Sequence, residues 1–228
     1  MADKNISYKR GFLNPKELIQ RMGDIPNKLN IVSSVKVLFD SYRFGKKYTK
    51  ELKLNVGSKA PNFTLPNALG NSVTLYGLLE EQNVVLIFYR GGWCPFFNMQ
   101  LRVFQNALDD FKSLGATIVA ISPQLPDKSL SQEEKLGLKF HVLSDKRSQV
   151  AKKFTGMLNY KGKSAEALNR LGIDLNDYNN NDCGEVPIPA VFVINSHKKI
   201  IFAQSEGGDY KKRVEPLDVQ NALRLHKK

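Results

Sequence analysis

The most informative stretch of the chain joins an apolar strand to a cysteine, and it reads Val84-Val85-Leu86-Ile87-Phe88-Tyr89-Arg90-Gly91-Gly92-Trp93-Cys94-Pro95-Phe96-Phe97. The apolar run predicts a strand that is buried on both faces, and the two glycines predict a turn. Pro95 suits the first helical position, where its missing N–H costs nothing. Apolar residues then recur with helical spacing over 95–113. Cys94 is therefore expected where a strand gives way to the N-terminus of a helix.

This position favours a reactive thiol. The first turn of a helix has unpaired backbone N–H groups and the positive end of the helix dipole, and both stabilise the thiolate, which is the nucleophilic form of cysteine. Arg90 adds a fixed positive charge four residues before Cys94. We therefore predict that Cys94 is a nucleophile and Arg90 its electrostatic helper. The alternatives are a buried structural cysteine, which is common, and a surface arginine at a strand end.

The segments on either side of this stretch predict an α/β fold. Strands are expected at 62–65, 72–75, 84–90, 117–122, 141–143, 188–194 and 199–204, and helices at 95–113, 129–138, 148–154, 164–171 and 216–226. Strands that alternate with helices favour parallel pairing through right-handed crossovers. The tight turn at 195–198 instead requires the last two strands to be antiparallel. The expected fold is thus a mixed β-sheet with helices on both faces.

Charge and composition limit the partners and the location. The net charge is +12, and residues 1–60 hold 13 of the 34 Lys and Arg but 5 of the 22 Asp and Glu. Because these basic residues are interleaved with apolar ones, we expect residues 1–55 to form a solvated, mostly helical extension rather than a nucleic-acid-binding arm. No membrane span and no secretory signal are expected from the apolar runs. Two cysteines make no disulfide framework, which favours a cytoplasmic protein.

Several motifs together resemble a known family. The opening resembles that of peroxiredoxins and reads Val56-Gly57-Ser58-Lys59-Ala60-Pro61-Asn62-Phe63-Thr64-Leu65. The stretch from Tyr89 to Pro95 resembles the active-site turn of the peroxiredoxin-like branch of the AhpC/TSA group, within the thioredoxin fold. Three later segments resemble the same branch: Ala120-Ile121-Ser122-Pro123-Gln124, Val142-Leu143-Ser144-Asp145 and Pro187-Ile188-Pro189-Ala190-Val191-Phe192-Val193-Ile194. The resemblance implies a thioredoxin-like, peroxiredoxin-like domain over residues 56–228.

The resemblance also implies a thiol-dependent peroxidase. Cys94 would attack the O–O bond of hydrogen peroxide or an organic hydroperoxide and become a sulfenic acid, and Arg90 would hold a peroxide oxygen. A thioredoxin-like or glutathione-like thiol would regenerate the enzyme, without a cofactor. No metal is expected, because His141, His197 and His226 have no ligand spacing with either cysteine. A homodimer is a further expectation from the resemblance.

The expected substrate-binding residues surround the cysteine. By the resemblance, Pro189 is a cis-proline that faces Cys94; the alternative is an ordinary trans proline at the start of a strand. Trp93 and Phe97 are expected to form an apolar rim for an organic hydroperoxide, next to Pro95. The alternative for these two aromatic residues is packing in the core or in a lid.

Cys183 is the second cysteine, in a polar loop six residues before Pro189. If that loop approaches Cys94, Cys183 could resolve the sulfenic acid by forming a disulfide. A disulfide requires Cα atoms about 4.4–6.8 Å apart, so this role depends on how the fold places the loop. The alternative is a loop thiol without a partner.

Two departures from the family pattern keep other functions open. Phe97 stands where many relatives carry a second cysteine, so local C-x-x-C chemistry is absent. Gly91 stands where standard peroxiredoxins place a Thr or Ser that binds the peroxide. These departures favour a second hypothesis, a thiol–disulfide exchange or redox-sensing protein without efficient peroxidase activity. A third hypothesis is a non-enzymatic scaffold whose basic N-terminus binds an anionic partner.

Overall fold

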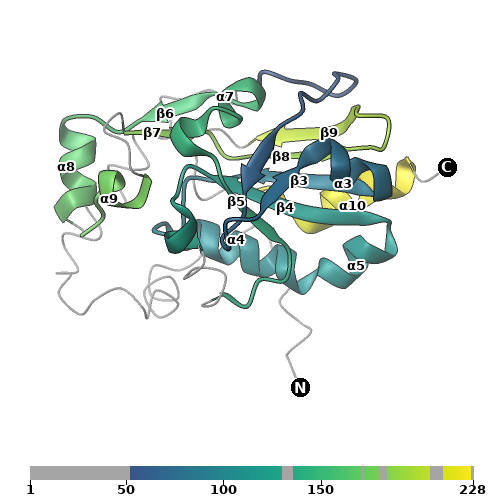
Figure 1. Cartoon of the computed structure of the whole chain (residues 1–228), viewed down its shortest axis with the longest axis horizontal. Coiled ribbons are helices and arrows are strands. Elements are labelled where there is room, and N and C mark those ends of the chain that lie inside the picture. Colours follow the sequence, from purple (N-terminus) through teal and green to yellow (C-terminus); the bar gives the residue numbers. More distant parts are fainter. Residues whose placement is uncertain (1–51, 130–135, 171, 180–183, 206–212, 227–228) are drawn as a thin grey trace.

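The computed structural model describes residues 52–129, 136–170, 172–179, 184–205 and 213–226 (Figure 1). The predicted extension over residues 1–51, most of the helix predicted at 129–138, and Cys183 lie outside these residues. The elements follow in the order β1 Thr64–Pro66, β2 Ser72–Thr74, α3 Leu75–Glu81, β3 Asn83–Phe88, α4 Pro95–Asn106, α5 Leu108–Ser113, β4 Ala116–Ser122, β5 His141–Ser144, η1 Lys146–Ser148, α7 Ala151–Phe154, β6 Met157–Asn159, α8 Lys163–Arg170, α9 Leu175–Asn179, β7 Glu185–Pro187, β8 Ala190–Ile194, β9 Ile200–Ser205 and α10 Pro216–Leu225.

A five-stranded sheet in the order β5-β4-β3-β8-β9 forms the centre of the molecule. The pairs β3–β4 and β4–β5 are parallel, whereas β3–β8 and β8–β9 are antiparallel. The predicted mixed sheet is therefore confirmed, and so is the antiparallel pairing of the last two strands. β3 is the central strand, as its continuous apolar run predicts.

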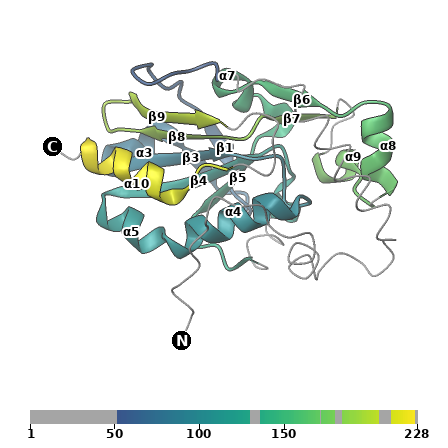
Figure 2. The ribbon, with the colours of Figure 1, turned by 180° about the vertical axis from the view of Figure 1, so that it is seen from behind.

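Each face of the sheet is covered by its own hydrophobic cluster. Val85 and Ile87 of β3 pack with buried residues of α4, α5 and α10 on one face. Val84 and Leu86 point the other way and pack with α3 and α7. Figure 1 shows α3 in front of the sheet, and Figure 2, which turns the molecule round, shows α10 in front. The expected helix layers on both faces are thus present.

α3 differs from the sequence prediction, which ends the second strand at Leu75. In the structure the strand β2 ends at Thr74, and Thr74 is the N-cap residue of a seven-residue helix. Leu75 and Leu79, one helical turn apart, are both buried against the sheet. The helix is too short to produce a clear periodic pattern in the sequence.

A small unit over residues 157–187 projects from one end of the sheet (Figure 1). Its strands β6 and β7 pair antiparallel, with Leu158 opposite Val186, and α8 and α9 lie between them in the chain. Five of its buried residues form a separate cluster together with the adjoining Ile188: Leu158, Tyr160, Leu168, Leu175 and Val186. Of this β6–β7 unit the sequence predicts α8 alone, because strands of three residues carry too short an alternation to recognise.

Pro189 is in the trans form, because the described residues contain no cis peptide bond. The prediction of a cis-proline is therefore wrong, and the alternative of a trans proline just before a strand is confirmed. The carbonyl groups on both sides of this peptide are held in place: Thr155 Oγ1 donates to Ile188 O at 3.0 Å, and Ser205 Oγ donates to Pro189 O at 2.7 Å. These bonds fix the backbone that leads directly into β8.

Residues 52–60 run along the domain before β1. Leu52 forms a β-bridge with Thr155, and Lys53 N donates to Phe154 O at 3.0 Å. Farther along, Gly57 N donates to Ile200 O at 2.8 Å. Pairing with the domain therefore includes residue 52, slightly before the expected boundary at residue 56.

Gly184 allows the chain to cross closely over Tyr160, and this generates a stability prediction. A Cβ on Gly184 would overlap the carbonyl oxygen of Tyr160, whereas a Cβ on Gly162, in the same unit, would meet nothing within 4 Å. Both glycines have a positive φ, +63° and +54°. We expect Gly162→Ala to lower the free energy of unfolding by about 1–2 kcal/mol, because alanine disfavours the left-handed backbone. Gly184→Ala should lower it by about 1–3 kcal/mol more, because the backbone atoms of Tyr160 cannot move away from the added methyl group.

Urea denaturation of the two variants measures this difference in the free energy of unfolding. Equal losses in both variants would contradict the close crossing at Tyr160.

Candidate active site

Cys94 lies at the junction of strand, turn and helix that the sequence predicts. It is the N-cap residue of α4, and Pro95 is the first helical residue. Cys94 N donates to Gly91 O at 3.3 Å, which closes the turn, and Cys94 O accepts from Phe97 N at 3.0 Å, which starts the helix. Only 7% of Cys94 is exposed, and it is a free thiol.

Two side chains hold the turn before Cys94. Gln124, just after the carboxyl end of β4, accepts a hydrogen bond from Gly92 N at 2.7 Å. Asn98, in the first turn of α4, donates from Nδ2 to Gly92 O at 2.9 Å. Neither side chain is predicted from the sequence as part of the site, although Gln124 lies in a family motif. The parallel pairing of β3 and β4 brings Gln124 to the same sheet edge as the turn.

Gly91 is required by both its backbone and its surroundings. Its φ is +144°, which residues with a side chain rarely adopt, and a Cβ atom on residue 91 would lie 2.5 Å from Trp93 Nε1. The indole of Trp93 thus fills the space that a Thr or Ser side chain would need. A side chain with a hydroxyl group at position 91 is therefore incompatible with this packing.

Arg90 is a buried cation, so the alternative of a surface arginine is excluded. Its side chain is 3% exposed, and its Nη1 donates to the hydroxyl of Tyr160 at 2.9 Å. Its Cζ lies 5.7 Å from the ring centroid of Phe97. The Tyr160 ring in turn meets Trp93 edge-on, with centroids 6.2 Å apart and an interplanar angle of 87°.

The Cys94 thiol responds to two opposed effects. Burial raises the pKa of Cys94 above its ordinary value, and this is the largest influence. Arg90, the backbone N–H groups of Phe96 and Phe97, and Arg213 lower the pKa in turn. The stabilising groups that the sequence predicts are therefore present, although desolvation has the larger effect on the pKa of Cys94.

Arg213 is a second cation at the site that sequence reasoning missed. It lies just before α10, and its Nη1 donates to Phe96 O at 2.6 Å, while its Cζ lies 5.7 Å from the Phe96 ring centroid. It reaches the first turn of α4 from 117 residues farther along the chain. No local pattern marks such a long-range contact.

The remaining predicted site residues have different surroundings. Phe97 is 1% exposed and packs against Tyr89, with ring centroids 6.4 Å apart, so its position favours the packing alternative. Trp93 is half-buried and packs against both the α4 side of the core and the β6–β7 unit. Pro189 precedes Ala190, which pairs with Phe88, and so lies at the sheet edge where β3 ends.

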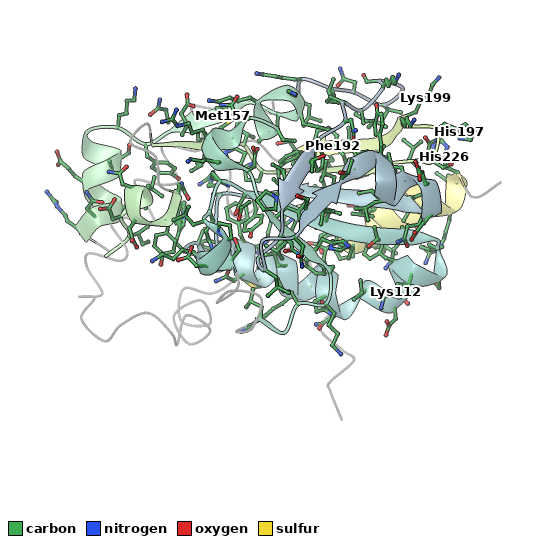
Figure 3. All side chains as sticks on the ribbon, viewed as in Figure 1. Lys112, Met157, Phe192, His197, Lys199 and His226 are labelled. Carbon is green, nitrogen blue, oxygen red and sulfur yellow. The ribbon has the colours of Figure 1, made fainter. Side chains whose placement is uncertain are left out.

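Histidines and acidic residues form no metal centre in the part of the chain that the structure describes, where no three His, Cys, Asp or Glu side chains gather in a way that could hold an ion. Figure 3 shows His197 and His226 at the end of the molecule opposite to Met157, which begins the β6–β7 unit. Among the same described residues, no helix combines the length and apolarity needed to span a bilayer.

Comparison with known proteins identifies the family. Residues 56–203 match the model of the AhpC/TSA family, which is more than half of the chain. The chain belongs to this family. Peroxiredoxin Bcp of Escherichia coli is 31% identical over 120 residues, which is 52% of this chain and 76% of the relative.

A Mycobacterium tuberculosis protein with a provisional peroxiredoxin name is 38% identical over 102 residues, but the match spans only 64% of its length and 45% of this chain. Solved structures show the same fold. Peroxidoxin BcpB of Mycobacterium tuberculosis superimposes with a TM-score of 0.58 at 22% identity, over 75% of this chain and 97% of that one. A cysteine-to-serine mutant of Xylella fastidiosa PrxQ gives 0.58 at 20% identity, over 77% and 98%. The predicted thioredoxin-like, peroxiredoxin-like fold is thus confirmed.

The balance of burial and positive charge at Cys94 predicts a definite pH dependence. A Cys183→Ser variant leaves Cys94 as the only thiol. Its alkylation rate should increase with pH, and the pH midpoint of this increase should be higher in the folded protein than in the same protein unfolded in guanidinium. The sign follows because only the thiolate reacts and burial disfavours the charged form. Iodoacetamide labelling followed by intact-mass spectrometry measures both midpoints. A folded midpoint below the unfolded one would show that Arg90 and α4 dominate over burial.

Proposed function

We propose that this AhpC/TSA-family protein is a thiol-dependent peroxidase with Cys94 as its nucleophile. The observation that carries the proposal is a buried cation, Arg90, that packs over the ring of Phe97 in the first turn of α4, whose N-cap residue is Cys94. A cation and the backbone N–H groups of a helix N-terminus together stabilise a thiolate and the negative oxygen that leaves the peroxide. Family membership supports the same chemistry.

The reaction starts with loss of the Cys94 proton to solvent. The thiolate sulfur then attacks one peroxide oxygen, so that an S–O bond forms as the O–O bond breaks. The cysteine is oxidised to sulfenic acid, and the leaving oxygen takes up a proton to become water or an alcohol. We propose that Arg90 stabilises the charge on that oxygen. Because residue 91 is glycine, no hydroxyl group at that position shares this role.

A thiol must then return Cys94 to its reduced state. We propose that Cys183 attacks the sulfenic sulfur and releases water, and that a thioredoxin-like or glutathione-like thiol then attacks the Cys94–Cys183 disulfide to give a mixed disulfide. A second thiol reduces the resulting disulfide. This cycle uses no resident cofactor.

Replacement of the nucleophile tests the proposal. Cys94→Ser should lower the rate of hydrogen peroxide consumption, with excess thiol present, by more than roughly 1000-fold, because no other group can take over the covalent step. Cys183→Ser is the matched control, and it should keep fast formation of a trapped sulfenic acid on Cys94. Peroxide turnover retained in Cys94→Ser would overturn the proposal. If the wild-type protein reacts with peroxide no faster than free cysteine but forms mixed disulfides readily, the thiol-exchange hypothesis replaces it.

Cys183 is our proposed resolving thiol. It is bonded to Gly184, whose carbonyl accepts a hydrogen bond from Tyr160 N at 2.9 Å, and Tyr160 binds Arg90. After one equivalent of peroxide, the wild-type protein should lose both free thiols and lack the added oxygen mass, since the disulfide releases water. Cys183→Ser should instead keep the sulfenic acid. Intact-mass spectrometry without reductant distinguishes the two, and a stable sulfenic acid in the wild-type protein would exclude Cys183 from this role.

A further inference from the structure

Tyr160 connects the β6–β7 unit to the reactive cysteine. Its hydroxyl accepts a hydrogen bond from Arg90 Nη1 at 2.9 Å, although the two residues are 70 positions apart in the sequence. Both side chains are buried, with 5% of Tyr160 and 3% of Arg90 exposed. A buried hydrogen bond to a charged group contributes more to stability than one between neutral groups. The contact therefore helps to fix the position of the guanidinium.

Tyr160 itself is held on several sides. Its N–H donates to Gly184 O at 2.9 Å, and Gly184 has no Cβ atom that would overlap the carbonyl oxygen of Tyr160. Its ring meets Trp93 edge-on and belongs to the apolar cluster of the β6–β7 unit. The hydroxyl is therefore a fixed acceptor, while the Phe97 ring, 5.7 Å from Arg90 Cζ, provides a second fixed surface.

We propose that Tyr160 is a positioning residue that holds the Arg90 guanidinium beside Cys94. This inference deepens the proposed function and rests on it, because the same cysteine and arginine carry both. It assigns a role to the β6–β7 unit, which supplies a hydroxyl group to the site from outside the strand–turn–helix segment.

Loss of the hydroxyl should weaken the effect of Arg90 on Cys94. In Tyr160→Phe the ring and its packing remain, but a buried N–H donor loses its acceptor, and such a group moves toward another partner. The positive charge then acts less on the sulfur, so the pKa of Cys94 should increase further above its ordinary value.

The test measures alkylation of Cys94 against pH in the full-length Cys183→Ser protein, with and without Tyr160→Phe. At pH 7 the variant should react roughly 3- to 10-fold more slowly, since one pKa unit corresponds to a tenfold change in thiolate population. The two rates should converge as pH increases through the Cys94 pKa. Identical pH profiles would overturn the proposal, and so would a rate loss that is the same at every pH.

Tyr76→Phe is the matched control. Its hydroxyl also makes one hydrogen bond, to Ala60 O at 2.8 Å, but Tyr76 packs with the cluster on the α3 face of the sheet. The control should leave the Cys94 profile unchanged. An equal shift in Tyr76→Phe would show a general effect of stability and would overturn the specific role of Tyr160.

A double-mutant cycle separates an effect through Arg90 from a direct one. In an Arg90→Met background, Tyr160→Phe should change the alkylation rate by less than about twofold, because the group that it positions is absent. Additive effects would overturn the proposal. Because alkylation needs no peroxide, a protein that fails to reduce peroxide but shows the predicted shift would refute the proposed peroxidase while supporting the role of Tyr160.

Discussion

The central strand β3 has no exposed side chain between Val84 and Phe88, and the rest of the molecule is arranged around this constraint. A strand that is apolar on both faces needs a helix layer on each side and a paired strand at each edge. With β4 parallel and β8 antiparallel to it, the carboxyl ends of β3 and β4 and the beginning of β8 meet at one edge of the sheet. The chain leaves β3 at this edge, and Arg90, the glycine turn and Cys94 follow at once. The candidate site thus follows directly after the carboxyl end of the central strand β3.

The same burial has opposite effects on the two groups that the proposed function uses. Removal of water from around Cys94 raises its pKa, because the thiolate loses hydration. Removal of water from around Arg90 strengthens its field at the sulfur, because charges interact more strongly at low dielectric. Burial of the Arg90 guanidinium costs free energy unless partners replace its water, and the Tyr160 hydroxyl and the Phe97 ring are two of them. The surroundings of Cys94 and Arg90 therefore combine groups from the β3–α4 segment with a hydroxyl from the β6–β7 unit.

The features that can be predicted from sequence are those encoded by adjacent residues. β3, β4, β8 and β9 have continuous apolar runs, and α4 begins at a proline, so the sequence predicts their types correctly. Cys94 and Arg90 stand in one short motif. The contacts that complete the site join distant segments, since Gln124, Tyr160 and Arg213 make their hydrogen bonds across 32, 70 and 117 residues of the chain. The prediction of the isomer of Pro189 is wrong for the same reason, because the isomer depends on hydrogen bonds that no local pattern contains. The direction in which the pKa of Cys94 shifts likewise depends on burial, which distant segments provide.

The two departures from the family pattern belong to one packing arrangement. Gly91 leaves the space that the Trp93 indole occupies, and this indole meets the Tyr160 ring edge-on. Phe97 gives Arg90 an aromatic surface on the side of α4, which a cysteine at that position would remove. A hydroxyl group at position 91 would displace the indole, and with it the support of the tyrosine that binds Arg90. The chain thus lacks a hydroxyl group at position 91 and a second thiol at position 97. With Gly91 and Phe97 at these positions, Arg90 contacts two aromatic residues, Phe97 and Tyr160.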